Sequence, residues 1–258
     1  MKVVLIAIIL LFEGLFLVFS FKHKKMESIE FEDNDGGGII ITPSDGQYDS
    51  VIFWFHGLGD TAHGWADAIE YLNIPKAKLI LPNAPTRPIS LNYGHSMPGW
   101  SDIYGLNAND PEDIEGFTNS ANRINGFIEK EVTENNISPS RIIIGGFSQG
   151  GALALHLTLR HQKYAFGGCI AFSTWLPFHA DYPSALSPHA SSLPIFQAHG
   201  TSDTIVPYKW GHNSHLLLKT LIPSPEPTLL SIPNMAHSSH PRELEECKRF
   251  ILERLKTE

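Results

Sequence analysis

A serine between two pairs of glycines constrains the fold most: the apolar run RIII at 141–144 leads directly into GGFSQGG at 145–151. Four glycines in seven residues add almost nothing to a hydrophobic core, so this segment serves something other than packing. The apolar run predicts a buried strand, and residues 150–160 predict a helix. The sequence therefore indicates a strand that turns very tightly into a helix, with Ser148 at the turn.

Apolar runs and helical patterns alternate along most of the 258 residues, 42% of which are hydrophobic. Strands are predicted at 51–55, 78–82, 141–145, 168–172, 194–200 and 228–232, and helices near 65–71, 110–135, 150–160, 210–221 and the C-terminus. Such alternation predicts one α/β domain with a mostly parallel sheet and helices on both faces. In such sheets, ligands bind at the carboxyl ends of the strands.

The first 25 residues differ from the rest of the chain. An apolar run extends from Val3 to Phe21, interrupted by Glu13 and followed by KHKK at 22–25. The run is near the length of a bilayer-spanning helix, and the basic residues after it place the body of the protein in the cytoplasm. We expect an uncleaved membrane anchor. A cleaved signal peptide, which would lead to the secretory pathway, and a mispredicted start codon are alternatives.

The polar residues 26–45 predict a linker that ends in a short edge strand near 38–42, so the folded domain is expected over 46–258. Residues 83–110 are rich in Pro, Gly and Asn and predict a long loop, after which Asp110 and Pro111 are expected to begin a helix. A net charge of −8 without a basic stripe argues against a nucleic-acid partner. The only two cysteines, Cys169 and Cys247, lie in separate apolar contexts and predict buried free thiols.

The residues from Gly146 to Gly150 match G-x-S-x-G, and the strand before and the helix after them are the context of a nucleophile elbow. A serine is a poor nucleophile without a base. In hydrolases with such an elbow, the acid and the histidine follow later in the chain, each after a strand. Asp203 follows the strand at 194–199, and His237 follows the strand at 228–232. We therefore predict a triad in which His237 takes the proton of Ser148 and Asp203 orients the imidazole.

Each partner of the serine has an alternative. His240 is close to His237 but precedes Pro241, where a helix is expected to begin. Asp181 is the alternative acid, but it lies before the strand that should precede the acid. The predicted oxyanion donors are the backbone N–H groups of Gln149 and Leu58. His56 is expected to order the loop of Leu58 rather than to react.

The 13 histidines form neither H-E-x-x-H nor a Cys/His array, so no metal site is expected. Gly57 and Gly59 lack the further glycines of a dinucleotide-binding loop. We expect no cofactor.

The chain resembles the acyl-protein thioesterases, in the phospholipase and carboxylesterase branch of the α/β-hydrolases. The stretches that carry the resemblance run from about residue 51 to the C-terminus: FHGLGDTAHGWAD, LPNAPTRPISLN, MPGWSDIYGL, RIIIGGFSQGGALAL, STWLP, HGTSDTIVP and NMAHSSH. Ser148, Asp203 and His237 fall on the positions of the family's triad, and Leu58 and Gln149 on those of its oxyanion donors. Ala62 and Asn234 stand where the family often has Gly, and the chain lacks the N-terminal cysteine that some members use for lipidation.

The resemblance implies an α/β-hydrolase fold and hydrolysis of acyl thioesters, notably S-palmitoyl groups on protein cysteines. It also implies that Trp175, Leu176 and Met97 bind the acyl chain, although core packing is an alternative for Trp175 and Met97. The alternative functions are a lysophospholipase or broad carboxylesterase and, more remotely, an inactive hydrolase fold that serves as a binding protein. The expected partners are S-acylated proteins or lysolipids and a membrane surface, and the chain is expected to be a monomer or a weak dimer.

Overall fold

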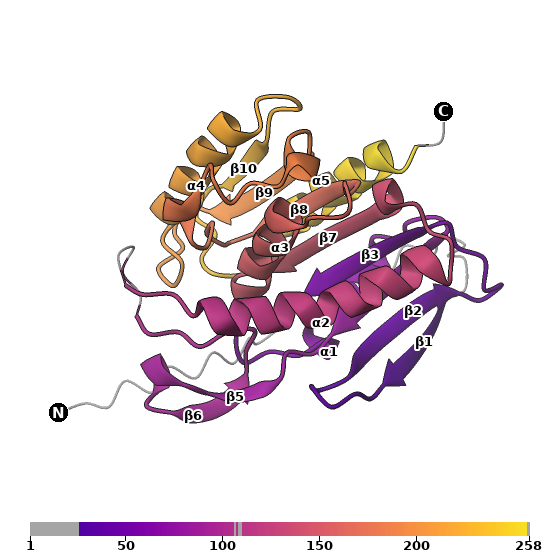
Figure 1. Ribbon diagram of the computed structural model, residues 1–258, viewed down its shortest axis with the longest axis horizontal. Coiled ribbons are helices and arrows are strands. Elements are labelled where there is room, and N and C mark those ends of the chain that lie inside the picture. The colour runs from indigo at the N-terminus through magenta and orange to yellow at the C-terminus, as the bar shows by residue number, and fades with distance from the viewer. Residues whose placement is uncertain (1–25, 106, 108–109, 257–258) are drawn as a thin grey trace.

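The computed structural model describes residues 26–105, 107 and 110–256, so the segment expected to be an anchor lies outside the described residues. In the described part, no helix is both long and apolar enough to cross a membrane. One sheet of eight strands runs through the molecule in the order β1-β2-β4-β3-β7-β8-β9-β10 (Figure 1). These strands are β1 (Met26–Phe31), β2 (Gly38–Pro43), β3 (Ser50–Phe55), β4 (Ala77–Pro82), β7 (Ile142–Phe147), β8 (Gly168–Phe172), β9 (Ile195–Gly200) and β10 (Thr228–Ile232).

Within this sheet, β4, β3, β7, β8, β9 and β10 pair in parallel. Strand β2 pairs antiparallel with both of its neighbours, β1 and β4. The predicted mostly parallel sheet is therefore confirmed. Five α-helices join or follow these strands: α1 (His63–Tyr71), α2 (Ile114–Thr133), α3 (Gln149–Arg160), α4 (Tyr208–Leu221) and α5 (Pro241–Arg254).

Strand β3 shows how the two faces of the sheet are covered. Its side chains alternate between two hydrophobic clusters, with Val51, Phe53 and Phe55 in one and Ile52 and Trp54 in the other. The first cluster contains the apolar faces of α2, α3 and α4, and the second contains those of α1 and α5. Because successive residues of a strand point to opposite faces, a strand that is buried throughout requires helices on both sides.

The structure corrects the prediction for residues 26–45, a linker that ends in an edge strand. Strand β1 occupies Met26–Phe31, and β2 lies between β1 and β4 rather than at the edge of the sheet. Strand β1 is the edge of the sheet, and its side chains are mostly exposed, so the sequence there lacks the apolar run that identifies a buried strand. A second correction concerns the start of α2. Its N-cap is Asp113, whose side chain accepts from the Gly116 N–H, whereas the Asp110 side chain accepts from Asn107.

Part of the long loop predicted at 83–110 is a small hairpin of β5 (Thr86–Ile89) and β6 (His95–Pro98). Its strands are only four residues long and each contains a proline, which weakened the strand signal in the sequence. In Figure 1 the hairpin projects beneath the start of α2. The two cysteines are buried and free, as predicted.

Candidate active site

Ser148 lies between β7 and α3 with a backbone conformation of φ 54° and ψ −122°. The turn is this tight because glycines flank it. A Cβ atom at Gly146 would lie 2.5 Å from the Gly150 carbonyl, and one at Gly150 would lie 2.2 Å from the Phe55 carbonyl oxygen. The strand therefore passes into the helix without a spacer, and the serine is held in a strained conformation.

The structure brings Ser148, His237 and Asp203 together. The Ser148 Oγ lies 3.0 Å from His237 Nε2, and His237 Nδ1 lies 2.7 Å from Asp203 Oδ2. Each side chain follows a different strand, namely β7, β9 and β10, and all three strands are parallel neighbours or near neighbours in the sheet. Parallel strands end at one edge, which is why residues far apart in sequence meet here.

Asp203 accepts hydrogen bonds at both carboxylate oxygens. Oδ1 accepts from the N–H groups of Ile205 and Val206, and Oδ2 accepts from His237. Burial alone raises the pKa of Asp203, but the hydrogen bonds from His199, His237 and the Val206 backbone outweigh it and bring that pKa well below the usual 3.8. The carboxylate is therefore ionised and only accepts.

This fixes the tautomer of His237. Since Nδ1 must donate to the Asp203 carboxylate, the lone pair of Nε2 points to the Ser148 hydroxyl. Phe147 packs against the imidazole, with ring centroids 4.7 Å apart, and helps to hold it in place. A histidine in this state is arranged to accept a proton from Ser148.

The alternative residues have other partners. His240 is the N-cap of α5: its Nδ1 accepts from the Arg242 N–H while Glu243 accepts from the His240 N–H. Asp181 forms an ion pair with Arg160 at 2.8 Å, and about half of its side chain is exposed. In the described structure, neither residue forms a hydrogen bond with the side chain of Ser148 or His237.

The loop of Leu58 lies against Ser148, as an oxyanion site requires. A Cβ atom at Gly57 would lie 3.4 Å from Ser148 Cβ, so the glycine permits this close approach. Gln149 is the first residue of α3, and the N–H groups of the first helical turn have no partner within the helix. The Leu58 N–H likewise makes no hydrogen bond to another described residue. Both predicted donors are therefore available to a ligand oxygen.

A set of buried hydrogen bonds holds this loop beside α3. The Gln149 side chain accepts from the Trp100 N–H at 2.9 Å and donates to the Ser101 carbonyl at 2.9 Å. The Trp100 indole donates to the His56 carbonyl, and the His56 ring donates to the Gly57 carbonyl while accepting from the Ala84 N–H. Burial lowers the pKa of His56, which keeps the ring neutral, so it orders the loop as expected.

Sequence reasoning missed the roles of the Gln149 side chain and of Trp100. The sequence indicates a role only for the backbone N–H of Gln149, and Trp100 stands only within the stretch MPGWSDIYGL that carries the resemblance. The available signal was the polar side chain of Gln149 at the start of α3, a helix that is buried along almost its whole length.

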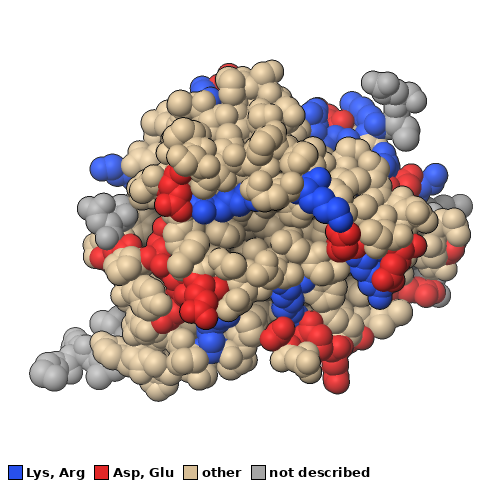
Figure 2. Space-filling view, in the orientation of Figure 1, with Lys and Arg blue, Asp and Glu red and all other residues tan. Residues whose placement is uncertain are grey.

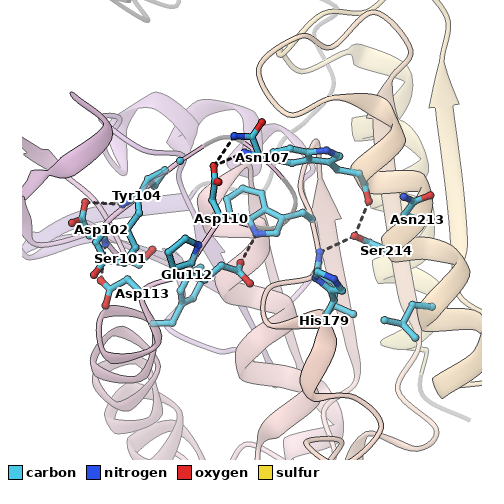
Figure 3. A pocket seen from close by; sticks show the side chains of 18 residues that line it. Ser101, Asp102, Tyr104, Asn107, Asp110, Glu112, Asp113, His179, Asn213 and Ser214 are labelled. Carbon is cyan, nitrogen blue, oxygen red and sulfur yellow. Dashed lines mark hydrogen bonds between the residues drawn. The ribbon is translucent and has the colours of Figure 1, made fainter. Parts of the chain in front are cut away.

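A cavity of about 210 Å³ lies beside this network (Figure 3). Trp175 and Leu176 line it, whereas Met97, Ser148 and His237 are not among its lining residues. Met97 instead borders the loop of Leu58, where its sulfur would lie 3.5 Å from a Cβ at Gly59. The cavity meets the candidate site through Ser101, which contacts Gln149.

An apolar wall and a group of acidic side chains both line the cavity. The apolar wall includes Phe117, Trp175, Leu176, Trp210 and Leu217, and the acidic residues are Asp102, Asp110, Glu112 and Asp113. Figure 2 shows acidic side chains gathered over the region where α2 begins. Among the described residues, no cluster of His, Cys, Asp and Glu could hold a metal ion.

A nucleophile elbow, a hydrogen-bonded Ser-His-Asp set and a mostly parallel sheet define an α/β-hydrolase. Comparison with known proteins narrows the class: the model of the phospholipase/carboxylesterase family matches residues 37–254, and the chain belongs to this family. A relative from Cryptococcus neoformans, named acyl-protein thioesterase 1, is 38% identical over 84% of this chain and 96% of its own length.

Solved structures show the same fold. Acyl-protein thioesterase 2 from Zea mays matches with a TM-score of 0.75 at 28% identity, covering 90% of this chain and 99% of its own. SOBER1 from Arabidopsis thaliana matches with a TM-score of 0.74 at 29% identity, covering 80% of this chain and 99% of its own. The resemblance stated from the sequence motifs is thereby confirmed.

Proposed function

We propose that this chain is a serine hydrolase that cleaves acyl thioesters. The proposed substrates are protein cysteines that carry long acyl chains such as palmitoyl. One observation carries the proposal: Ser148 Oγ, His237 and Asp203 form an unbroken hydrogen-bonded chain of 3.0 and 2.7 Å. The relatives named acyl-protein thioesterase 1 support the choice of substrate, with identities of 34–38% over most of the chain.

In the proposed reaction, His237 Nε2 removes the hydroxyl proton as Ser148 Oγ attacks the thioester carbonyl. The negative oxygen of the tetrahedral intermediate accepts from the N–H groups of Leu58 and Gln149, close to the positive end of α3. The C–S bond then breaks, and protonated His237 returns its proton to the leaving thiolate. A water molecule, deprotonated by His237, hydrolyses the acyl-Ser148 ester and releases the fatty acid.

Asp203 supports both steps without changing its own protonation. It stabilises the imidazolium that forms at His237 and prevents the ring from turning. The low pKa of Asp203 keeps the carboxylate charged throughout the neutral pH range.

The acyl chain is proposed to occupy the cavity at Trp175 and Leu176, because apolar side chains form its wall and it adjoins Gln149. Met97 is proposed to contact the part of the acyl chain nearest the oxyanion loop. A direct test compares hydrolysis of a palmitoyl-thioester peptide with that of lysophosphatidylcholine. Faster turnover of the peptide supports the thioesterase, whereas faster turnover of the lysolipid contradicts this choice of substrate.

We also propose that residues 1–25 anchor a cytoplasmic, monomeric or weakly dimeric hydrolase domain to a membrane, so that it stays beside lipidated substrates. Because β1 begins at Met26, the proposed domain starts directly after this segment rather than after a linker. Fractionation of cells that express the full chain or residues 26–258 tests the anchor. Equal amounts of both forms in the soluble fraction would contradict it.

A further inference from the structure

The loop after β8 contains part of the cavity wall, and hydrogen bonds connect it to three neighbouring segments. Thr174 Oγ1 donates to the Ser148 carbonyl at 2.6 Å, which connects the loop to the nucleophile. The Leu176 N–H donates to Ser214 Oγ of α4 at 2.8 Å. The third connection is made by the side chain of Glu112, which lies just before α2. The position of the wall relative to Ser148 therefore depends on these three contacts.

Glu112 uses both of its carboxylate oxygens in this tie. Oε1 accepts from the Trp175 indole N–H at 2.9 Å (Figure 3). Oε2 accepts from the Phe178 backbone N–H at 2.6 Å. An ionised carboxylate only accepts, and hydrogen bonds to a charged group are shorter and stronger than neutral ones. Because the two donors bind different oxygens, a side chain with one acceptor oxygen in place of two leaves one of them without its partner.

The neighbouring acidic residue, Asp113, has a different structural role. Asp113 caps α2 through the Gly116 N–H, accepts from the Asp102 N–H and lies 3.6 Å from Arg87. The start of α2 is thus secured without Glu112, whose two bonds both cross to the loop after β8. Glu112 therefore acts on the wall of the cavity rather than on the helix that follows it.

We propose that Glu112 is a specificity-determining residue that sets which acyl chain lengths the cavity accepts. The carboxylate fixes the plane and depth of the Trp175 ring, and this ring and Leu176 are part of the apolar wall of the cavity. If the Trp175 ring is free to turn, the shape of the apolar space around a long acyl chain changes. A short acyl chain fills less of this space, so its binding hardly changes. This inference rests on the proposed function and names the residue that determines its preference for acyl chain length.

The test is Glu112→Gln, assayed with butyryl, octanoyl and palmitoyl thioesters of one peptide. The amide keeps one acceptor, so either the indole or the Phe178 N–H loses its partner. Leaving a buried donor without a partner has a free-energy cost that corresponds to about fivefold or more in an equilibrium constant. We expect kcat/KM for palmitoyl, relative to butyryl, to fall by about this factor.

Glu129→Gln is the matched control. Glu129 also accepts two side-chain hydrogen bonds, from Lys163 and Tyr164, but it lies on the later part of α2 and does not line the cavity. The control should keep the wild-type ratio between chain lengths. A purely structural role of Glu112 would instead lower the rates for all three chains by the same factor.

A double-mutant cycle with Trp175→Phe sharpens the result, because phenylalanine keeps an aromatic wall but lacks the N–H that Glu112 binds. In this background, Glu112→Gln should change the chain-length ratio by less than in the wild type. An equal change in both backgrounds, or no change of the ratio in either, would overturn the inference while leaving the proposed function intact. If the wild type hydrolyses none of the thioesters, the proposed function itself fails, and the inference with it.

Discussion

His237 Nε2 lies 3.0 Å from Ser148 Oγ, although the two residues are 89 positions apart in the chain. The separation is spanned by β8, β9, β10 and the helices between them, which return the chain repeatedly to one edge of the sheet. The contact therefore requires the C-terminal half of the chain to fold correctly. Local changes that keep the fold but alter this contact are therefore informative.

The first prediction concerns the acid. Asp203→Asn should lower kcat by about 10⁴-fold, because an amide can donate to Nδ1 and so favours the wrong tautomer of His237. The matched control is Asp181→Asn at the alternative acid, whose ion pair with Arg160 is half exposed. This control should stay within about twofold of wild-type activity, since exposed ion pairs contribute little. Activity loss in the control and not in Asp203→Asn would assign the acid to Asp181.

The second prediction concerns the tight turn at Ser148. Gly150→Ala should destabilise the protein by about 1–3 kcal/mol or more, because its methyl group would lie 2.2 Å from the Phe55 carbonyl oxygen. Gly126→Ala, in the middle of α2, meets nothing within 4 Å and should stabilise it by about 0.5–1 kcal/mol. Thermal unfolding of both variants measures the difference. Equal melting temperatures would show that the turn tolerates a side chain.

The third prediction concerns Glu243, which is fully buried in the capping box of α5. Burial raises the pKa of its carboxyl from 4.5 to about 8, although Oε1 accepts from the His240 N–H. The folded state therefore holds this proton more tightly than the unfolded state does. The stability contributed by this group is present below about pH 4.5 and is lost as the pH rises towards 8.

Glu243→Gln keeps the cap and carries no titratable carboxyl, so its stability should not show this loss. We expect the variant to gain stability over the wild type between pH 5 and 9, by on the order of a few kcal/mol at the alkaline end. Denaturant unfolding across this range measures it. Glu246→Gln, on the same helix but paired with Arg249 at the surface, serves as the control. Parallel stability curves for the Glu243 variant and the wild type would contradict the prediction.

The sequence predicted the sheet and the triad because their signals are local and strong. The run RIII is apolar enough to identify β7, and each candidate acid or base was ranked by the strand that it follows. Asp203 could be chosen over Asp181 on that basis, and His237 over His240 because His240 directly precedes the helix expected from Pro241. Parallel strands then dictate that the chosen residues meet at one edge.

Other features depend on contacts that no local pattern contains. Strand β1 has only half-buried or exposed side chains, so its existence depends on pairing with β2 rather than on burial. Asp110 and Asp113 both suit an N-cap, and tertiary contacts of Asp113 with Asp102 and Arg87 decide between them. The two hydrogen bonds of Glu112 join segments more than 60 residues apart and had no signal in the sequence.

Labelling of the nucleophile tests the central claim most directly. The full chain is incubated with a fluorophosphonate probe, and the modified peptide is identified by mass spectrometry. We predict a single adduct on Ser148, which His237→Ala slows strongly and Ser148→Ala abolishes together with thioester hydrolysis. An adduct on another residue, or full hydrolytic activity in a folded Ser148→Ala variant, would contradict the account.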